Sequence, residues 1–307
     1  MKVTIKGRVL YSPCPTIDIP CCSIFSVLKT GVESAAKKIV LVDDRLQLTP
    51  AEFLSRAKRY AVGFQAHGVK PGDLQHHIAA GDASRILTDP KNEPKAIRVK
   101  KLLDLKDVFV MGATADGTNA SEFESADEKS FEELPVPDPK ATVVALAFAV
   151  DRAGPPKAVE ITHYSFVVNF YTCRTSISDD GTDVILASHP IAHMAGFLYT
   201  LVAALIGKTC VVCSPSLPFD KLVRVIDEYK VIIIYSKAAS FLFQIIDVAT
   251  GEKLGPNEAG ELCYRIPSVM KGYYKDPEKT AQVMDAEGWC RSGMSNPNNI
   301  ECVQTPH

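Results

Sequence analysis

Long apolar runs are missing from this sequence. Its 307 residues contain no stretch of eighteen or more consecutive apolar residues, whereas a membrane-spanning helix needs roughly twenty. The longest apolar segments, around residues 143–150 and 197–206, are too short and are expected to be buried core. Residues 1–7 lack a charged region followed by an apolar run, so neither a spanning helix nor a secretory signal is predicted.

An excess of charge of one sign is also missing. The chain has 34 Lys and Arg residues against 36 Asp and Glu residues, a formal net charge of -2 and a pI of about 6.4. Nucleic-acid-binding proteins usually carry a strong basic surplus, so no nucleic-acid partner is expected. A hydrophobic content of 46% and a charged content of 23% are typical of globular proteins.

The sequence also lacks a recognisable metal-binding motif. The nine cysteines are an odd, scattered set, which indicates reduced thiols in an intracellular compartment. Cys210 and Cys213 form one CxxC within a strand-like run, but a zinc site needs a second pair, so buried core thiols are expected. His189 and His193 lack an HExxH frame or a third ligand, and no metal site is predicted there.

The first clear element is a helix from residue 50 to residue 66. Thr49 can cap it, Pro50 suits its first turn, and Glu52 completes a capping box. Farther along, residues 111–140 are polar and acidic and are interpreted as a solvated connector.

The second half of the chain alternates between strand-like and helix-like sequence patterns. Short apolar, β-prone runs predict strands, and the segments between and after them have helical patterns. The predicted strands are 142–150, 184–187 and 209–213, and the predicted helices are 163–171 and 219–229. This alternation favours an α/β core with a mostly parallel sheet.

Residues 148–163 read Phe-Ala-Val-Asp-Arg-Ala-Gly-Pro-Pro-Lys-Ala-Val-Glu-Ile-Thr-His, between an apolar strand and a helix. The segment resembles the phosphate-binding loop of the AMP-forming adenylate-forming ligases, the family of 4-coumarate–CoA ligases, fatty acyl-CoA synthetases and beetle luciferases. The matching positions are Gly154, Pro156, Lys157, Val159, Thr162 and His163.

Three further segments strengthen the resemblance, in the family's order. Residues 190–196, Pro-Ile-Ala-His-Met-Ala-Gly, are similar to the family's segment bordering the acyl pocket. Residues 247–262 resemble its Asp-x-x-Thr-Gly-Glu-x-Leu-Gly-Pro hairpin. Residues 269–280 and 285–289 are similar to the run that leads into its ribose-binding motif.

The resemblance implies an incomplete N-terminal domain of the adenylate-forming ligase fold: a layered α/β structure with mixed sheets and a small β-rich part. We expect a shortened adenylation domain at 1–293, with losses near 74–85 and 240–246, and a divergent tail at 294–307. The family's C-terminal lid domain, with its catalytic lysine, is expected to be absent.

The family makes an acyl-adenylate from ATP and a carboxylic acid, and then an acyl-CoA thioester. ATP with Mg²⁺, coenzyme A and a small fatty or aromatic acid are therefore the implied ligands. Matching positions make Gly154, Lys157 and Thr162 candidate nucleotide-phosphate residues, and His193 and Gly196 candidate acyl-pocket residues. No catalytic residue and no metal ligand is assigned. Each candidate also has a purely structural alternative. Lys157 would be a surface lysine at a helix start, His193 a histidine of the core, and Gly154 and Gly196 turn residues.

Several departures from the family pattern predict impaired catalysis. Asp151 replaces a glycine of the loop and brings a negative charge where the phosphates approach. The hydroxyl-bearing positions of the family loop are Ala149, Val150, Arg152 and Ala153 in this chain. Met294 occupies the position of the ribose-binding aspartate, and a thioether is a weak acceptor. The adenine-binding motif has no counterpart.

Three hypotheses stay open at this point. The chain is a working acyl- or aryl-CoA ligase, a non-catalytic protein that binds an acyl group or a partner, or a truncated product without a separate role. Many family members are peroxisomal and end in a targeting tripeptide, whereas this chain ends Thr-Pro-His. A cytoplasmic location is therefore the expectation.

Overall fold

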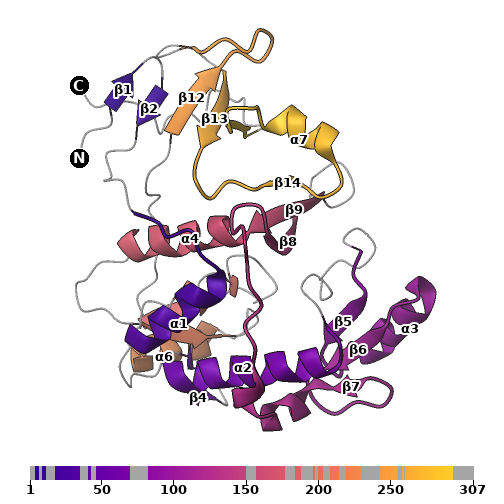
Figure 1. Ribbon diagram of the computed structural model, residues 1–307. Helices are drawn as coiled ribbons and strands as arrows, with labels where there is room; N and C mark the ends of the chain where they lie inside the picture. The colour runs from indigo at the N-terminus through magenta and orange to yellow at the C-terminus, as the bar shows by residue number, and fades with distance from the viewer. Residues whose placement is uncertain are drawn as a thin grey trace.

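The computed structural model (Figure 1) describes residues 4–6, 9–11, 18–34, 41–42, 46–69, 82–149, 157–176, 184–187, 196–197, 200–202, 208–213, 219–229, 242–254, 258 and 260–292. Its described strands form four sheets, with strand orders β1-β2-β12-β13-β15, β10-β11-β3-β4, β14-β9-β8 and β5-β6-β7. The predicted mixed α/β fold is confirmed.

A mostly parallel sheet was expected, and this is wrong for two of the four sheets. β5-β6-β7 is parallel throughout, and β10-β11-β3 is parallel with β4 antiparallel at its edge. The other two sheets are antiparallel. Apolar runs predict burial and not strand direction, because a strand covered on both faces looks alike in either direction.

The sheet of β10 (Val184–Ala187), β11 (Thr209–Val212), β3 (Leu41–Val42) and β4 (Gln47–Leu48) is covered on both faces. One face forms a cluster of Ile185, Ala187 and Cys210, and the other packs Val211 and Cys213 against α6 (Phe219–Tyr229). Burial raises the pKa of Cys210 to about 12, so this thiol stays protonated. The expectation of buried core thiols is confirmed.

The sheet of β5 (Arg85–Thr88), β6 (Asp107–Val110) and β7 (Thr118–Asn119) lies between two helical layers. The helix α3 (Glu93–Leu103) packs Ala96 against Ile86 and Val108. On the other side, Phe109 is fully buried beneath α2 (Pro50–Ala66) and makes an edge contact with Phe64 at 5.1 Å. A buried Arg85 is paired across the strands with Asp107 at 2.8 Å.

The bounds and the capping box predicted for the helix α2 are both confirmed. Thr49 accepts a hydrogen bond from the Glu52 N–H, and the Glu52 carboxylate accepts one from the Thr49 N–H at 2.8 Å. These bonds satisfy two backbone donors that helix formation would otherwise leave exposed at the helix start.

The acidic segment 111–140 is not simply a solvated connector, which corrects that interpretation. It contains β7 and two 3₁₀ helices, η1 (Ala120–Ser125) and η2 (Glu128–Ser130), that dock on α2. The Glu124 carboxylate accepts hydrogen bonds from Arg56 at 3.2 Å and Tyr60 at 3.0 Å. Phe123 is buried against α2 at Gly63, where an added Cβ would lie 2.2 Å from the Phe123 ring.

Another sheet is antiparallel and consists of β1 (Thr4–Lys6), β2 (Val9–Tyr11), β12 (Leu242–Ile246), β13 (Glu261–Arg265) and β15 (Cys290–Arg291). Its core consists of Val9, Ile246, Cys263 and the single tryptophan, Trp289. In Figure 1 this sheet lies above α4 (His163–Ser176), and α1 (Ile24–Ser34) and α2 lie below it. None of the helices in the described ranges combines the length and the apolar composition that a membrane span requires.

Phe123→Ala should lower the free energy of unfolding by about 3–5 kcal/mol, because it removes a buried aromatic ring and leaves a cavity between η1 and α2. The measurement is urea unfolding followed by circular dichroism.

Leu134→Ala on the same segment is the matched control. Leu134 is 51% exposed, so this change should stay within about 0.5 kcal/mol of the parent. Equal, small effects of both substitutions would restore the interpretation of this segment as a solvated connector.

Candidate functional site

The candidate site is built on a three-stranded sheet, β14-β9-β8, in the middle of the molecule (Figure 1). The strands β8 (Val143–Ala149) and β9 (Lys157–Thr162) form an antiparallel pair. Ala149 pairs with Lys157 at the end of this hairpin, so residues 150–156 are the loop that the sequence analysis matched to a phosphate-binding loop. The sheet therefore holds both ends of that loop in register.

Lys157 is the first residue of β9 and not a surface lysine at a helix start. The helix begins six residues later, at His163. Val159, Ile161 and Thr162 are β-branched, which favours a strand over an extended loop. The side-chain direction of Lys157 is therefore set by the pleat of β9.

The third strand places an aromatic ring beside Lys157. In β14 (Gly272–Tyr273), Tyr273 pairs with Val159, which lies two residues from Lys157 and on the same face of the sheet. The Lys157 ammonium is 5.5 Å from the centroid of the Tyr273 ring, within the range of a cation–π contact. Tyr273 thus constrains where the Lys157 charge lies.

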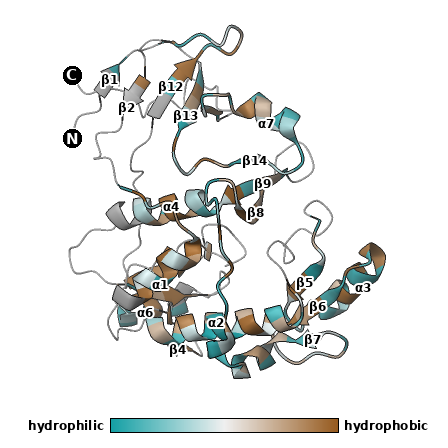
Figure 2. Cartoon of the chain, viewed as in Figure 1, coloured by the Kyte–Doolittle hydropathy of each residue, from teal (hydrophilic) through white to brown (hydrophobic). Residues whose placement is uncertain are grey.

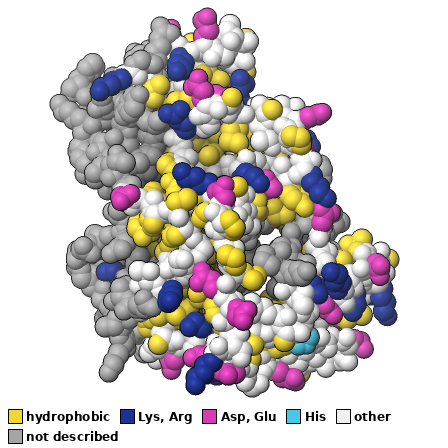
Figure 3. All heavy atoms as spheres, viewed as in Figure 1, with side chains coloured by type: hydrophobic (Ala, Val, Ile, Leu, Met, Phe, Trp, Pro, Cys, Tyr) yellow, Lys and Arg dark blue, Asp and Glu magenta, His cyan; other side chains and the backbone are white. Residues whose placement is uncertain are grey.

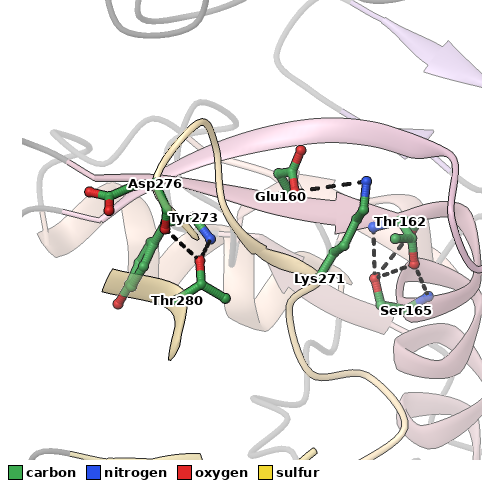
Figure 4. Close-up of polar contacts among 7 residues, drawn as sticks. All are labelled: Glu160, Thr162, Ser165, Lys271, Tyr273, Asp276 and Thr280. Atoms are coloured by element: carbon green, nitrogen blue, oxygen red, sulfur yellow. Dashed lines mark hydrogen bonds and ion pairs between the residues drawn. The ribbon is translucent and has the colours of Figure 1, made fainter. Parts of the chain in front are cut away.

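Tyr273 is itself held by α7 (Pro277–Val283), as Figure 4 shows. The Tyr273 N–H donates to Thr280 Oγ1 at 2.9 Å, and that hydroxyl donates to the Asp276 carbonyl oxygen at 2.8 Å. Hydrogen bonds from Lys279 hold the pKa of the Asp276 carboxyl below its usual value, and the charge of Lys157 adds to this effect. The Lys157 charge is therefore near the start of α7.

The opposite face of β9 carries a separate ion pair. Glu160 pairs with Gly272 in the sheet, and its carboxylate is 3.9 Å from the Lys271 ammonium (Figure 4). Because successive side chains of a strand alternate between faces, Glu160 does not share the face of Lys157.

The far end of the β14 segment is tied to the β5 region. The Tyr274 hydroxyl donates to Asp82 Oδ2 at 3.0 Å, and the Lys275 ammonium also contacts that carboxylate. The hydrogen bond from Lys275 is the largest cause that lowers the pKa of Asp82. These contacts join segments almost two hundred residues apart in the chain.

Thr162 lies at the junction of β9 and α4 and is buried. Its hydroxyl accepts the Ser165 N–H at 3.1 Å, and Ser165 Oγ accepts the Thr162 N–H at 3.0 Å (Figure 4). This reciprocal pair caps α4. A phosphate contact by Thr162 stays a prediction, whereas the observed contacts of its hydroxyl are structural.

The first N–H groups of α4 are already used within the protein. His163 donates to the Thr142 carbonyl at 3.1 Å, and Tyr164 donates to the Pro139 carbonyl at 2.9 Å. A helix start binds an anion through such N–H groups only when they are free. The α4 terminus is therefore not the phosphate site, and the candidate groups are those of the hairpin loop and Lys157.

Of the two candidate acyl-pocket residues, Gly196 is described and His193 lies outside the described residues, as does Gly154 of the loop. Gly196 is buried, and its carbonyl accepts a hydrogen bond from Thr200 at 2.8 Å. The adjacent Phe197 packs on Phe166 of α4 with ring centroids 5.6 Å apart. Through α4, the Gly196 segment shares a core with the loop hairpin.

Charge of both signs surrounds the site. Figure 3 shows Lys and Arg atoms interspersed with Asp and Glu atoms across the middle of the molecule. Within the described part of the chain, no three His, Cys, Asp or Glu side chains gather as they would around a metal ion.

Sequence reasoning found Lys157 but missed the roles of Tyr273 and Ser165. Tyr273 lies in the quoted segment 269–280, where it was expected only to pack beneath the hairpin of Glu261, and Ser165 lies in the predicted helix 163–171. Gly272 was a usable signal, because an added Cβ there would lie 3.0 Å from Thr280, so the glycine permits α7 to approach β14.

Comparison with solved structures identifies the fold. The chain matches a luciferase-like enzyme of the mealworm Zophobas morio with a TM-score of 0.80 and 17% identity, covering 94% of this chain and 95% of that one. It matches a long-chain-fatty-acid–CoA ligase of Archaeoglobus fulgidus with a TM-score of 0.78 and 16% identity, covering 91% and 82%. The fold is that of the adenylate-forming ligases.

The family model described as AMP-binding enzyme matches residues 73–242, more than half of the chain. The chain belongs to this AMP-binding enzyme family. A 4-coumarate–CoA ligase of Pinus taeda is 54% identical over 50 residues, which are 16% of this chain and 9% of the relative. A luciferin 4-monooxygenase of Photinus pyralis is 45% identical over 53 residues, or 17% and 10%. These matches span about a tenth of the relatives' length.

His163 should make stability depend on pH. Its Nδ1 accepts the Ile24 N–H at 3.2 Å, which requires the neutral ring, and burial lowers its pKa below the usual 6.5. This stabilisation is therefore fully present above pH 6.5 and is lost as the pH falls from there towards the folded-state pKa. Thermal melts at a series of pH values would measure the decline.

His163→Ala should remove the pH-dependent part and cost about 1–3 kcal/mol at neutral pH, because the Ile24 N–H loses its acceptor. His163→Asn keeps a side-chain acceptor without titrating, so it should flatten the pH dependence at a smaller cost. An unchanged pH dependence in both variants would show that other groups cause it.

Proposed function

We propose that this protein binds ATP through the loop between β8 and β9, with Lys157 contacting the phosphates, and that its capacity to form an acyl-adenylate is impaired. The arrangement of Lys157 is the observation that carries the proposal. Lys157 closes a hairpin loop in the family-matched position, and its ammonium is held 5.5 Å from the Tyr273 ring. A positioned cation at the end of a backbone loop suits a polyphosphate.

The acid ligand would be a fatty or aromatic carboxylic acid. Phe197, the neighbour of Gly196, packs on Phe166 of α4, which supports an apolar environment next to the Gly196 segment. Gly196 and His193 are the proposed pocket residues. Mg²⁺ would enter bound to ATP, and coenzyme A would be the acceptor if the second half-reaction occurs.

Impairment follows from two residues within the chain. Asp151 puts a carboxylate into the loop, and at the short distances of a phosphate contact like charges repel strongly. Met294 offers a weak sulfur acceptor to a ribose hydroxyl where a carboxylate would be strong. Both changes weaken binding of the nucleotide before any chemistry. Binding without turnover is therefore the predicted behaviour.

Lys157→Met should weaken ATP binding about tenfold, which corresponds to about 1.4 kcal/mol, as measured by isothermal titration calorimetry at one fixed ionic strength. Tyr273→Leu should weaken it less, because the ammonium remains but loses its aromatic neighbour. In the Lys157→Met background Tyr273→Leu should have no further effect.

Lys271→Met is the matched control for this series. Lys271 is a cation on the same sheet, but it pairs with Glu160 on the opposite face, so its loss should leave ATP affinity unchanged. Equal effects of the two lysine substitutions would indicate general charge attraction and contradict a specific role of Lys157.

Asp151→Gly should strengthen ATP binding by about tenfold or more, because it removes both the charge and the Cβ from the loop. Asp151→Asn removes only the charge, so the difference between the two variants isolates the steric part. Carboxylate-dependent exchange of pyrophosphate into ATP, measured on the same variants, tests turnover. Vigorous exchange in the unaltered protein would overturn the proposed impairment.

A further inference from the structure

The outward face of α3 concentrates positive charge. Lys95, Arg98 and Lys101 are exposed and follow each other at intervals of three residues, which places them on one side of the helix. None of the three forms an ion pair with a described residue. Residues 89–106 contain six Lys and Arg against three Asp and Glu, whereas the whole chain has a net charge of -2.

The acidic residue of this helix is turned away from that face. Glu93 is 6% exposed, and its carboxylate accepts the N–H groups of Asp116 and Gly117, each at 2.9 Å. The Thr114 hydroxyl also donates to it. These bonds hold the pKa of Glu93 at about 2. The carboxylate thus accepts hydrogen bonds from the loop between β6 and β7. It does not neutralise Lys95, Arg98 and Lys101.

A large apolar side chain lies among these cations. Leu102 is 81% exposed and follows Lys95 by seven residues, so both lie on the outward side of the helix. The next residue, Leu103, is 46% exposed. Figure 2 shows hydrophobic colour at the end of α3, and in Figure 1 this helix lies at an extremity of the molecule.

The surface of Lys95, Arg98, Lys101 and Leu102 is called the α3 face below. Figure 3 shows Lys and Arg atoms next to hydrophobic atoms in the region of α3. Leu102 is the most exposed of the large hydrophobic side chains in the described part of the chain, and a membrane interface accepts an apolar side chain between cations that reach the headgroups.

We propose that the α3 face docks on an anionic lipid bilayer, with the cations at the headgroups and Leu102 inserted between them. Charge complementarity selects an anionic surface. The exposed leucine favours lipid over nucleic acid, because phosphate contacts use cations and polar groups and leave a leucine without a partner. Docking orients the protein and requires no spanning helix.

Flotation of the protein with vesicles tests the proposal. Vesicles of phosphatidylcholine alone are compared with vesicles that also contain phosphatidylserine. The protein should float only with the anionic vesicles, and added salt should release it because the charges are solvent-exposed. Lys95→Gln/Arg98→Gln/Lys101→Gln should lower the partition coefficient by about a hundredfold, since each cation near an anionic surface contributes roughly fivefold.

A matched control uses α6, which carries two exposed cations, Lys221 and Arg224. Lys221→Gln/Arg224→Gln should leave vesicle binding unchanged, and circular dichroism checks that each variant is folded. Failure to bind anionic vesicles at low salt, or an equal loss in the α6 variant, would overturn the proposal.

Leu102→Trp keeps every charge and reports insertion directly. Brominated lipids should quench the new tryptophan, whereas Trp289 is only 5% exposed and should be spared. Binding without quenching at position 102 would refute insertion. Tighter binding to an RNA oligonucleotide than to the anionic vesicles, lost in the same triple variant, would assign the face to nucleic acid instead.

Discussion

The structure of the candidate site depends on β9 being paired on both sides. Its pairing with β8 closes the loop at Lys157, and its pairing with β14 brings Tyr273 beside that lysine. The β14 partner comes from more than a hundred residues farther along the chain. Any change that shifts this register by one residue would send Lys157 to the opposite face, because side chains alternate along a strand.

Local signals in the sequence predicted local structure well. The bounds of α2 followed from its capping box, and α6 begins and ends where its periodicity indicated. The missed features depend on contacts between distant residues. The docking of Phe123 on α2 and the β14–β9 pair leave no periodic trace, because two paired residues cannot establish a pattern. The role of Tyr273 was missed for the same reason.

The candidate site shows which functional assignments sequence resemblance can support. Family matching proposed Lys157, which lies at the end of the β8–β9 loop. It also proposed Thr162, whose hydroxyl caps α4 with Ser165. A residue can therefore match a family motif either because it contacts a ligand or because the fold needs it. Hydrogen-bond partners distinguish them here, since a hydroxyl that is buried and satisfied within the protein has less to offer a ligand.

A thermal melt of the purified protein, with and without Mg-ATP and a non-hydrolysable acyl-adenylate mimic, tests the central claim most directly. Fluorescence of the single tryptophan, buried in the β12–β13 sheet, and circular dichroism should report one cooperative transition. We expect each ligand to raise its midpoint, because a ligand that binds only the folded state stabilises it. A cooperative transition that neither ligand moves would contradict nucleotide binding at the loop.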